Sequence, residues 1–300
     1  MEISITAPRG FSFKRTVISH GWCDLPPFEF DEEKWTLSRV IGIGDAHPIT
    51  VKVSEAGRNL KVSLSRKIGK RAQSSVERQV RHMFRLDDDM TAFYEAMAQD
   101  PAFEWIVKAG AGRLLRSPTV FEDLVKTICT TNCSWALTKK MIKELVGSLG
   151  REARGGGRNF PTPEAMASVT ESFYRDHVRA GYRAPYLKEL AESVASGSLD
   201  VEAWLASDLP AAELKRAMKR VKGVGDYAAE NLLKLVGRYD VLALDSWVRS
   251  TFARIHNGGR TATDKKIERY YARFGPWRGL ALWCDMTREW MDRDEQFISW

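Results

Sequence analysis

The spacing of apolar residues changes near residue 74, and this change constrains the fold more than any other feature of the chain. Before it, short segments rich in β-branched residues partly alternate between apolar and polar positions. Four such segments are predicted strands: residues 2–6, 15–19, 49–55 and 59–65, with a hairpin turn at 56–59. After it, Val76, Val80 and Met83 recur at helical spacing. The sequence therefore predicts an α+β protein, with an antiparallel β-rich module over residues 1–73 and a mainly helical region over 74–300.

The helical region contains N-cap signals and one glycine-rich loop. Asp87 or Asp88 is a candidate N-cap for the helix that follows, because a short polar side chain satisfies the first backbone N–H groups. Ser117 begins a helical pattern that runs without a break to the loop at 150–163. Most of the chain beyond that loop has helical periodicity, and we find no internal repeat.

A glycine turn with the sequence VKGVG joins two helical patterns over residues 211–236. Gly223 and Gly225 permit a positive φ and a close approach of the backbone to a ligand. The turn directs backbone N–H groups and the positive end of the second helix toward one point, which favours an anion such as a nucleic-acid phosphate. Asp226 is expected to cap the second helix. The alternative is a C-cap glycine followed by a tight turn between helices.

Positive charge is concentrated on the approach to this turn. The chain has 46 Lys and Arg residues against 39 Asp and Glu, for a formal net charge of +7. Five basic residues precede the turn: Lys215, Arg216, Lys219, Arg220 and Lys222. Only Glu213 opposes them within the same segment, and such a cluster attracts a polyanion without reading its sequence. The predicted phosphate-binding residues are Lys222, Gly223, Val224 and Gly225.

An isolated aspartate follows the apolar run VLAL, twenty residues after the second glycine of the turn. Asp245 precedes a new helical pattern with Val248, Phe252 and Ile255 at core spacing. It is therefore a candidate N-cap, and the helix dipole helps to keep such a carboxylate ionised. A purely structural cap is the alternative.

The hairpin GVG followed by D-x-x-V-R, from Asp245 to Arg249, after an apolar run resembles the helix-hairpin-helix DNA glycosylases, the HhH-GPD superfamily. The resemblance spans most of the chain and is strongest over residues 114–255. It implies a base-excision-repair DNA glycosylase that flips a damaged purine out of duplex DNA. It also implies that Asp245 is catalytic, because a carboxylate stabilises the positive charge that develops on the sugar and orients the attacking water.

Two further segments resemble the 8-oxoguanine DNA glycosylase branch of that superfamily. ICTTNCSWA is similar to the stretch that supplies an asparagine where the base was, which is Asn132 here. AGYRAPYLKELA is similar to the strand-invading stretch and makes Tyr182 the expected wedge, with Arg183 beside it. By contrast, residues 76–103 and the motif FGPWRGLALW are more similar to the 3-methyladenine DNA glycosylase II branch. The sequence therefore leaves oxidised and alkylated purines open as substrates.

Tyr227 occupies the position at which bifunctional members of the superfamily carry a lysine that forms a Schiff base with the sugar. A phenol cannot form a Schiff base, so the resemblance implies a monofunctional enzyme that uses water. Lys222 lies before the turn and Lys234 lies two helical turns beyond Tyr227, so neither is an evident substitute. The alternatives are a glycosylase and AP lyase that uses another lysine, a non-catalytic DNA-binding protein, and a helical protein unrelated to DNA.

Aromatic side chains are the candidates for a base-binding pocket, since a flipped purine stacks on them. The chain has 10 tryptophans. Four are proposed as pocket residues: Trp22, Trp135, Trp277 and Trp283. For each of them core packing is the alternative. Trp22 is preferred, and the neighbouring His20 is expected to be structural.

The sequence indicates no cofactor requirement. Four scattered cysteines show no CxxC spacing and do not match the clustered pattern of an iron–sulfur site, so we expect neither that cluster nor another metal centre. The resemblance implies that hairpin carbonyls hold a monovalent cation. The expected partner is double-stranded DNA with a damaged base, bound by a monomer. Since no signal peptide or transmembrane run is evident, we expect a cytoplasmic protein with no membrane partner.

Overall fold

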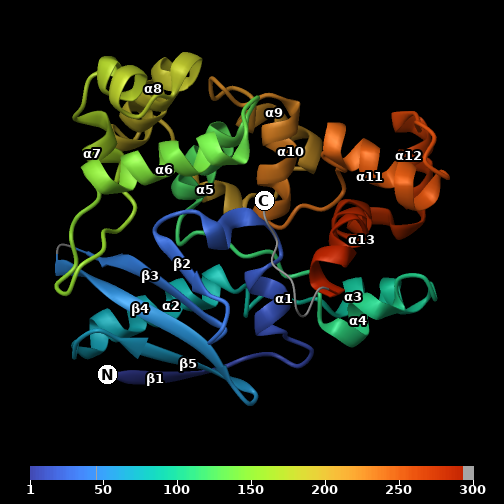
Figure 1. Ribbon diagram of the computed structural model, residues 1–300, viewed down its shortest axis with the longest axis horizontal. Coiled ribbons are helices and arrows are strands. Elements are labelled where there is room, and N and C mark those ends of the chain that lie inside the picture. Colours follow the sequence, from blue (N-terminus) through green and yellow to red (C-terminus); the bar gives the residue numbers. More distant parts are fainter. Residues whose placement is uncertain (45, 293–300) are drawn as a thin grey trace.

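The computed structural model describes residues 1–44 and 46–292, which form a β-sheet from the N-terminal part of the chain and a helical body packed against it (Figure 1). The five strands are antiparallel and are ordered β1-β5-β4-β3-β2. Their bounds are Glu2–Thr6 (β1), Phe28–Asp31 (β2), Thr36–Ile43 (β3), Ala46–Ala56 (β4) and Asn59–Leu64 (β5). The predicted α+β class is confirmed.

The central strand β4 has the alternating burial of a sheet with one face on the core. Ile49, Val51 and Val53 are buried, while the residues between them are more exposed. Val53 pairs with Leu37 of β3 on one side and Val62 of β5 on the other, which makes an apolar row across three strands. The hairpin between β4 and β5 lies at the predicted turn, residues 56–59.

One predicted strand is wrong and two strands were missed. Residues 15–19 fall largely in the helix α1 (Phe13–Val17), in which Phe13, Thr16 and Val17 are buried at helical spacing and the Ser12 hydroxyl accepts a hydrogen bond from Arg15 N. The missed strands are β2 and β3. In β3 a buried arginine, Arg39, occupies a core position and hides the apolar alternation.

The rest of the described chain is mainly helical (Figure 1). The α-helices after the sheet are Lys70–Met83 (α2), Thr91–Ala98 (α3), Glu104–Ala109 (α4), Val120–Thr130 (α5), Trp135–Leu149 (α6), Pro163–Ala167 (α7), Ala184–Ala195 (α8), Ala211–Met218 (α9), Asp226–Leu235 (α10), Ser246–His256 (α11), Asp264–Tyr271 (α12) and Arg278–Asp292 (α13). The predicted stripe on α2 is buried, as expected for an amphipathic helix on a core. No helix in the described ranges is long and apolar enough to cross a bilayer.

The continuous helix predicted from Ser117 to the loop at 150–163 is in fact two helices. Between α5 and α6 the chain turns at Asn132, which has a positive φ of 47°. The Thr131 hydroxyl donates to Ile128 O at the end of α5, and the Ser134 hydroxyl caps α6 by accepting from Leu137 N. Small polar side chains that bond to nearby backbone groups thus end one helix and start the next.

Two predicted N-caps are replaced by neighbouring residues. α3 begins after Met90 with no side-chain cap, and the Asp88 carboxylate instead accepts a hydrogen bond from Arg85 Nε at 2.7 Å. α5 is capped by the Thr119 hydroxyl, which accepts from Glu122 N at 3.2 Å, and not by Ser117. Each replacement is a shift of two or three residues, close to the usual uncertainty of helix ends.

A single apolar core runs through the described chain and joins the sheet to the helices. A buried ion group crosses the same boundary. Glu122 of α5 accepts hydrogen bonds from Arg39 of β3 at 2.9 Å and forms an ion pair with Lys126 at 2.7 Å. Because removing one partner of a buried pair leaves an uncompensated charge, this group ties α5 to the sheet. The predicted domain boundary near residue 73 stays a prediction.

Candidate active site

The predicted glycine turn lies between α9 and α10, and its two glycines differ in why they are needed. Gly223 has a φ of +87°, and a Cβ there would lie 2.8 Å from the Tyr186 ring. Gly225, the N-cap of α10, has a φ of −85°, and a Cβ would meet nothing within 4 Å. Packing therefore requires glycine at Gly223, whereas at Gly225 the fold itself leaves open space in front of the helix N-terminus.

The sequence predicted that Asp226 caps α10, but the N-cap of this helix is Gly225. Asp226 is the first residue of the helix, and its carboxylate pairs with Lys215 and Lys219 of the preceding helix, each at 2.9 Å. These hydrogen bonds lower the pKa of Asp226 to about 2. The pairing links α9 to α10 across the turn at an exposed position, so it adds little to the stability of the helix pair.

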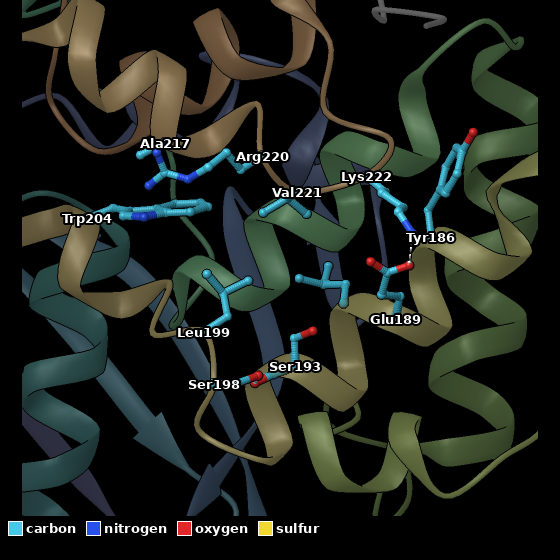
Figure 2. Close-up of a pocket in the computed structure, with 11 residues that line it drawn as sticks. Tyr186, Glu189, Ser193, Ser198, Leu199, Trp204, Ala217, Arg220, Val221 and Lys222 are labelled. Carbon is cyan, nitrogen blue, oxygen red and sulfur yellow. Dashed lines mark hydrogen bonds and ion pairs between the residues drawn. The ribbon is translucent and has the colours of Figure 1, made fainter.

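The basic cluster before the turn is opposed by more acids than the local sequence suggested. Figure 2 shows Lys222 extending toward Glu189 of α8, and its Nζ donates to that carboxylate at 2.7 Å. Lys215 also pairs with Glu230 at 2.5 Å. The Lys222 pair is exposed, and such pairs contribute little stability. Lys222 is therefore available to a stronger anion, although it is not an isolated cation.

Asp245 caps α11, as predicted. Its Oδ1 accepts a hydrogen bond from Val248 N at 2.7 Å, which fixes the orientation of the carboxylate. Ala243, two residues earlier, has a positive φ of 53°, so the chain turns sharply before the aspartate. The cap and the turn together hold Asp245 at the wall of a cavity of about 600 Å³.

That cavity is lined by aromatic side chains from five parts of the chain. Its described aromatic lining residues are Trp22, Trp135, Tyr227, Trp247, Trp283 and Trp290. Three of the four predicted pocket tryptophans are thus brought together with Asp245. The fourth, Trp277, lies outside the cavity lining and packs on Phe93 and Tyr239, with ring centroids at 5.6 Å from each.

The indole N–H groups of the three predicted tryptophans are all engaged with the protein. Trp22 donates to Asp123 at 2.7 Å, Trp135 donates to Asp24 at 2.9 Å, and Trp283 donates to the Ser19 carbonyl at 2.9 Å. These hydrogen bonds satisfy the indole N–H groups, so the part of each tryptophan that remains for a ligand is the aromatic ring surface.

His20 has the structural role expected for it. Its Nε2 lies 2.7 Å from the Leu115 carbonyl, and burial lowers the pKa of His20 to about 3. The ring is therefore neutral and donates its Nε2–H to that carbonyl. Gly21, the next residue, leaves room for the Trp135 ring, since a Cβ at that position would lie 2.5 Å from it.

Lys234, which was not an evident substitute for the Schiff-base lysine in the sequence, lies in the same cavity. Lys234 is only 3% exposed, and its Nζ lies 4.4 Å from the centre of the Trp283 ring. Burial lowers the pKa of Lys234 to about 8, against the opposing influence of Asp245. The signal for this placement is present in the sequence, because Tyr227, Asn231 and Lys234 are spaced to share one face of α10.

Tyr227 lies in the first turn of α10 and has no amine that could form a Schiff base. Burial, followed by the nearby Asp245 carboxylate, raises the pKa of Tyr227 to about 12. The phenol is therefore neutral near pH 7. It lies on the cavity wall with Asp245.

The predicted wedge residues lie together although 50 positions separate them in the sequence. The Tyr182 hydroxyl is 3.2 Å from Thr131 Oγ1 and accepts from Asn132 Nδ2 at 3.4 Å. Tyr182 is exposed, whereas Arg183 is buried beneath it, with its guanidinium 4.4 Å from the Tyr182 ring centre and bonded to the Thr131 carbonyl. Arg183 thus supports the tyrosine from below and is not itself a protruding side chain.

No group of three or more His, Cys, Asp or Glu side chains placed to hold a metal ion occurs among the residues that the structure describes. The four cysteines are free thiols, three of them buried. Cys129 belongs to α5 and Cys133 lies in the turn after it, where the Cys133 thiol donates to the Cys129 carbonyl at 3.1 Å.

Comparisons with known proteins show the family of this chain. A family model described as "HhH-GPD superfamily base excision DNA repair protein" matches residues 125–276, slightly more than half of the chain. The chain is 24% identical over 225 residues to a "Probable N-glycosylase/DNA lyase" of Methanothermobacter thermautotrophicus, covering 67% of this chain and 70% of that protein. It is also 24% identical over 212 residues to a "DNA-3-methyladenine glycosylase" of Bacillus subtilis, covering 68% and 69%.

The fold is similar to that of a solved structure as well. A "3-methyladenine dna-glycosylase from Archaeoglobus fulgidus" superposes with a TM-score of 0.74 at 20% identity, covering 97% of this chain and 99% of that one. The similarity includes both the sheet and the helical body, because the alignment spans nearly the whole of each chain.

Proposed function

The chain belongs to the HhH-GPD superfamily of base excision DNA repair proteins, and on this premise we propose that it is a DNA glycosylase that hydrolyses the N-glycosidic bond of a damaged purine. The observation that carries the proposal is the position of Asp245. Its carboxylate, oriented by a helix N-terminus, faces an aromatic cavity of about 600 Å³ behind the hairpin. A cavity of this kind suits a flipped base, and its single oriented carboxylate suits the sugar.

Asp245 has two tasks in this mechanism. As the bond between C1′ and the base nitrogen breaks, positive charge builds on the sugar, and a fixed carboxylate stabilises it. The same carboxylate accepts a proton from the water that attacks C1′. The hydrogen bond from Val248 N holds it in place, so little reorganisation is needed during the reaction.

Base flipping leaves a gap in the duplex that the protein must fill. Tyr182 is exposed and amphipathic, and its hydroxyl is tied to the 131–132 turn that also presents Asn132. Arg183 stacks beneath the ring and braces it. We assign Tyr182 as the wedge and Asn132 as the partner of the unpaired base, with Arg183 as their support.

The reaction in this proposal stops at base release. Tyr227 is neutral and cannot form a Schiff base. The second candidate function, a glycosylase with AP lyase activity, is favoured by one observation: Lys234 is an amine with a lowered pKa in the same cavity. Its depth argues against this role, since Lys234 lies seven residues, or about 10 Å, further along α10 than Tyr227.

Borohydride trapping distinguishes the two functions. A lyase forms an imine between its amine and the sugar, and reduction makes the adduct permanent. We expect no covalent protein–DNA adduct after base release by the wild-type chain. An adduct that disappears in Lys234→Gln, but persists in the surface variant Lys222→Gln, would contradict the monofunctional assignment and identify Lys234 as the nucleophile.

The partner in this proposal is duplex DNA gripped at the hairpin, and Gly225→Ala tests the grip. A methyl group at the open N-terminus of α10 would block a backbone N–H to phosphate contact, so we expect about tenfold weaker binding of damaged and undamaged duplexes alike. Fluorescence anisotropy at several salt concentrations measures the loss.

Gly69→Ala is the matched control for this experiment. Gly69 is also a helix N-cap with open space around a Cβ, but it begins α2, away from the hairpin. It is expected to leave affinity unchanged. Equal losses in both variants, or a loss confined to a single lesion, would contradict the phosphate contact. Binding that does not weaken with salt would contradict DNA as the partner.

A further inference from the structure

The ammonium group of Lys234 is a buried cation without a direct counter-ion. It is 3% exposed, and within the described residues only burial and charges acting through space, with no side-chain hydrogen bond, shift its pKa. Its one close contact there is the face of Trp283 at 4.4 Å. A cation–π contact offsets only part of the cost of removing an ammonium group from water. Because Lys234 lines the cavity, a ligand that enters it can supply the missing hydrogen-bond acceptors.

The groups around Lys234 do not supply that partner. Glu230, on the same helix, is already paired with Lys215. Cys284 of α13 and His20 are neutral near pH 7, because burial raises the pKa of the thiol and lowers that of the imidazole. Asp245 influences Lys234 through space without a hydrogen bond between the two. The free donors of the ammonium are consequently available to whatever enters the cavity.

The position of Lys234 on the wall indicates which part of a flipped nucleotide it meets. Tyr227 is 38% exposed, whereas Lys234, two helical turns further along α10, is 3% exposed and so lies deeper in the protein. The ammonium lies over the face of Trp283, so a base that enters the cavity meets it beside that ring. With the sugar at Asp245 and the base extending inward, the ammonium faces the base.

We propose that Lys234 is a specificity-determining residue that donates a hydrogen bond to a carbonyl oxygen or ring nitrogen of a neutral damaged purine and excludes N-alkylated purine cations. An aromatic cavity alone attracts cationic bases. An ammonium at its inner wall reverses that preference, because two like charges in a cavity of low dielectric repel strongly. The expected substrate class is an oxidised or deaminated purine, and this inference rests on the proposed function.

The chemistry of bond cleavage agrees with this assignment. A purine cation leaves C1′ as a neutral molecule, whereas a neutral purine leaves with the bonding electron pair as an anion. A hydrogen bond from Lys234 stabilises the negative charge that develops on the departing base. Water then supplies a hydroxyl to C1′ and a proton to Asp245, and one proton is returned to the base, so that the sum is hydrolysis. Alkylated bases need no such donor.

Single-turnover base release from matched duplexes tests the inference. The wild-type chain is expected to release hypoxanthine or 8-oxoguanine faster than 7-methylguanine. Lys234→Met is expected to slow release of the neutral purine about tenfold or more and to leave release of the cation equal or faster. Lys234→Arg retains the charge and the donor, and it is expected to keep the wild-type preference.

The pH dependence provides a second readout. Lys234 loses its proton above about pH 8, so release of a neutral purine by the wild-type chain is expected to fall as pH rises through that value. The Lys234→Met variant is expected to lack this step. Equal slowing of neutral and cationic bases in Lys234→Met, or a wild-type preference for the cation, would overturn the inference.

Binding of non-cleavable substrates separates this inference from the proposed function. If the wild-type chain released no base at all, the proposed function would be wrong. Duplexes with 2′-fluoro analogues of the same nucleotides would still report selection: tighter binding of the neutral base, lost in Lys234→Met, supports the role of Lys234, and equal binding of both bases refutes it.

Discussion

Replacing Asp245 with asparagine is expected to slow base release about a thousandfold while leaving duplex affinity within about threefold of wild type. The substitution removes the negative charge that stabilises the sugar cation and the acceptor for the proton of water. It keeps the fold, because asparagine caps helices as well as aspartate and can still accept from Val248 N. Single-turnover kinetics and anisotropy on the same duplex measure the two quantities.

Asp264→Asn is the control for that substitution. Asp264 lies in the first turn of α12 and accepts a hydrogen bond from Arg249 at 2.7 Å, outside the cavity lining. It is expected to retain the wild-type rate. If Asp245→Asn turned over at the wild-type rate, the assignment of Asp245 would be wrong and its role would be reduced to that of a structural cap.

Replacing Lys234 with methionine is expected to stabilise the folded protein by about 3 kcal/mol at pH 7, because the pKa of Lys234 falls from 10.5 to about 8 on folding. Below pH 8 the amine is charged in both states, and the folded state bears the whole cost of burying it. Between pH 8 and 10.5 the unfolded state binds more protons, so stability rises with pH. The advantage of methionine is therefore largest below pH 8 and declines toward pH 10.5.

Urea denaturation of both proteins at pH 7 and pH 9.5 measures this effect. Lys222→Met is the control, since Lys222 belongs to an exposed ion pair, and it is expected to leave stability essentially unchanged at either pH. A Lys234→Met variant that is less stable than wild type at pH 7 would contradict the description of Lys234 as a costly buried cation. A gain in stability with a loss of activity would identify a site at which function opposes stability.

The sequence predicted the parts of the fold that depend on local pattern. Apolar alternation predicted the strands of the β4–β5 hairpin. Helical periodicity and capping predicted the two helices on either side of the Gly223 turn and the cap at Asp245. β3 was missed because Arg39 occupies a core position, where its charge is compensated by Glu122, 83 residues away. Local pattern cannot reveal a charge that is neutralised through the tertiary fold.

The site could be predicted only in part for the same reason. Three of the four candidate tryptophans line the cavity, but Trp277 packs elsewhere, and which face of a helix looks inward depends on its neighbours. The depth of Lys234 required the helix to be placed against Trp283 of α13. Its spacing from Tyr227 was visible in the sequence, yet spacing alone does not distinguish a cavity wall from solvent.

The central claim is that this cavity hydrolyses the bond between a damaged purine and its sugar. The most direct measurement is base release by the wild-type chain from duplexes that contain 8-oxoguanine, hypoxanthine, 3-methyladenine, 7-methylguanine or uracil, with each strand analysed before and after hot alkali. We predict release of a free purine and a strand that breaks only after alkali, the mark of an intact abasic site. Tight binding of every duplex with no base released would contradict the claim.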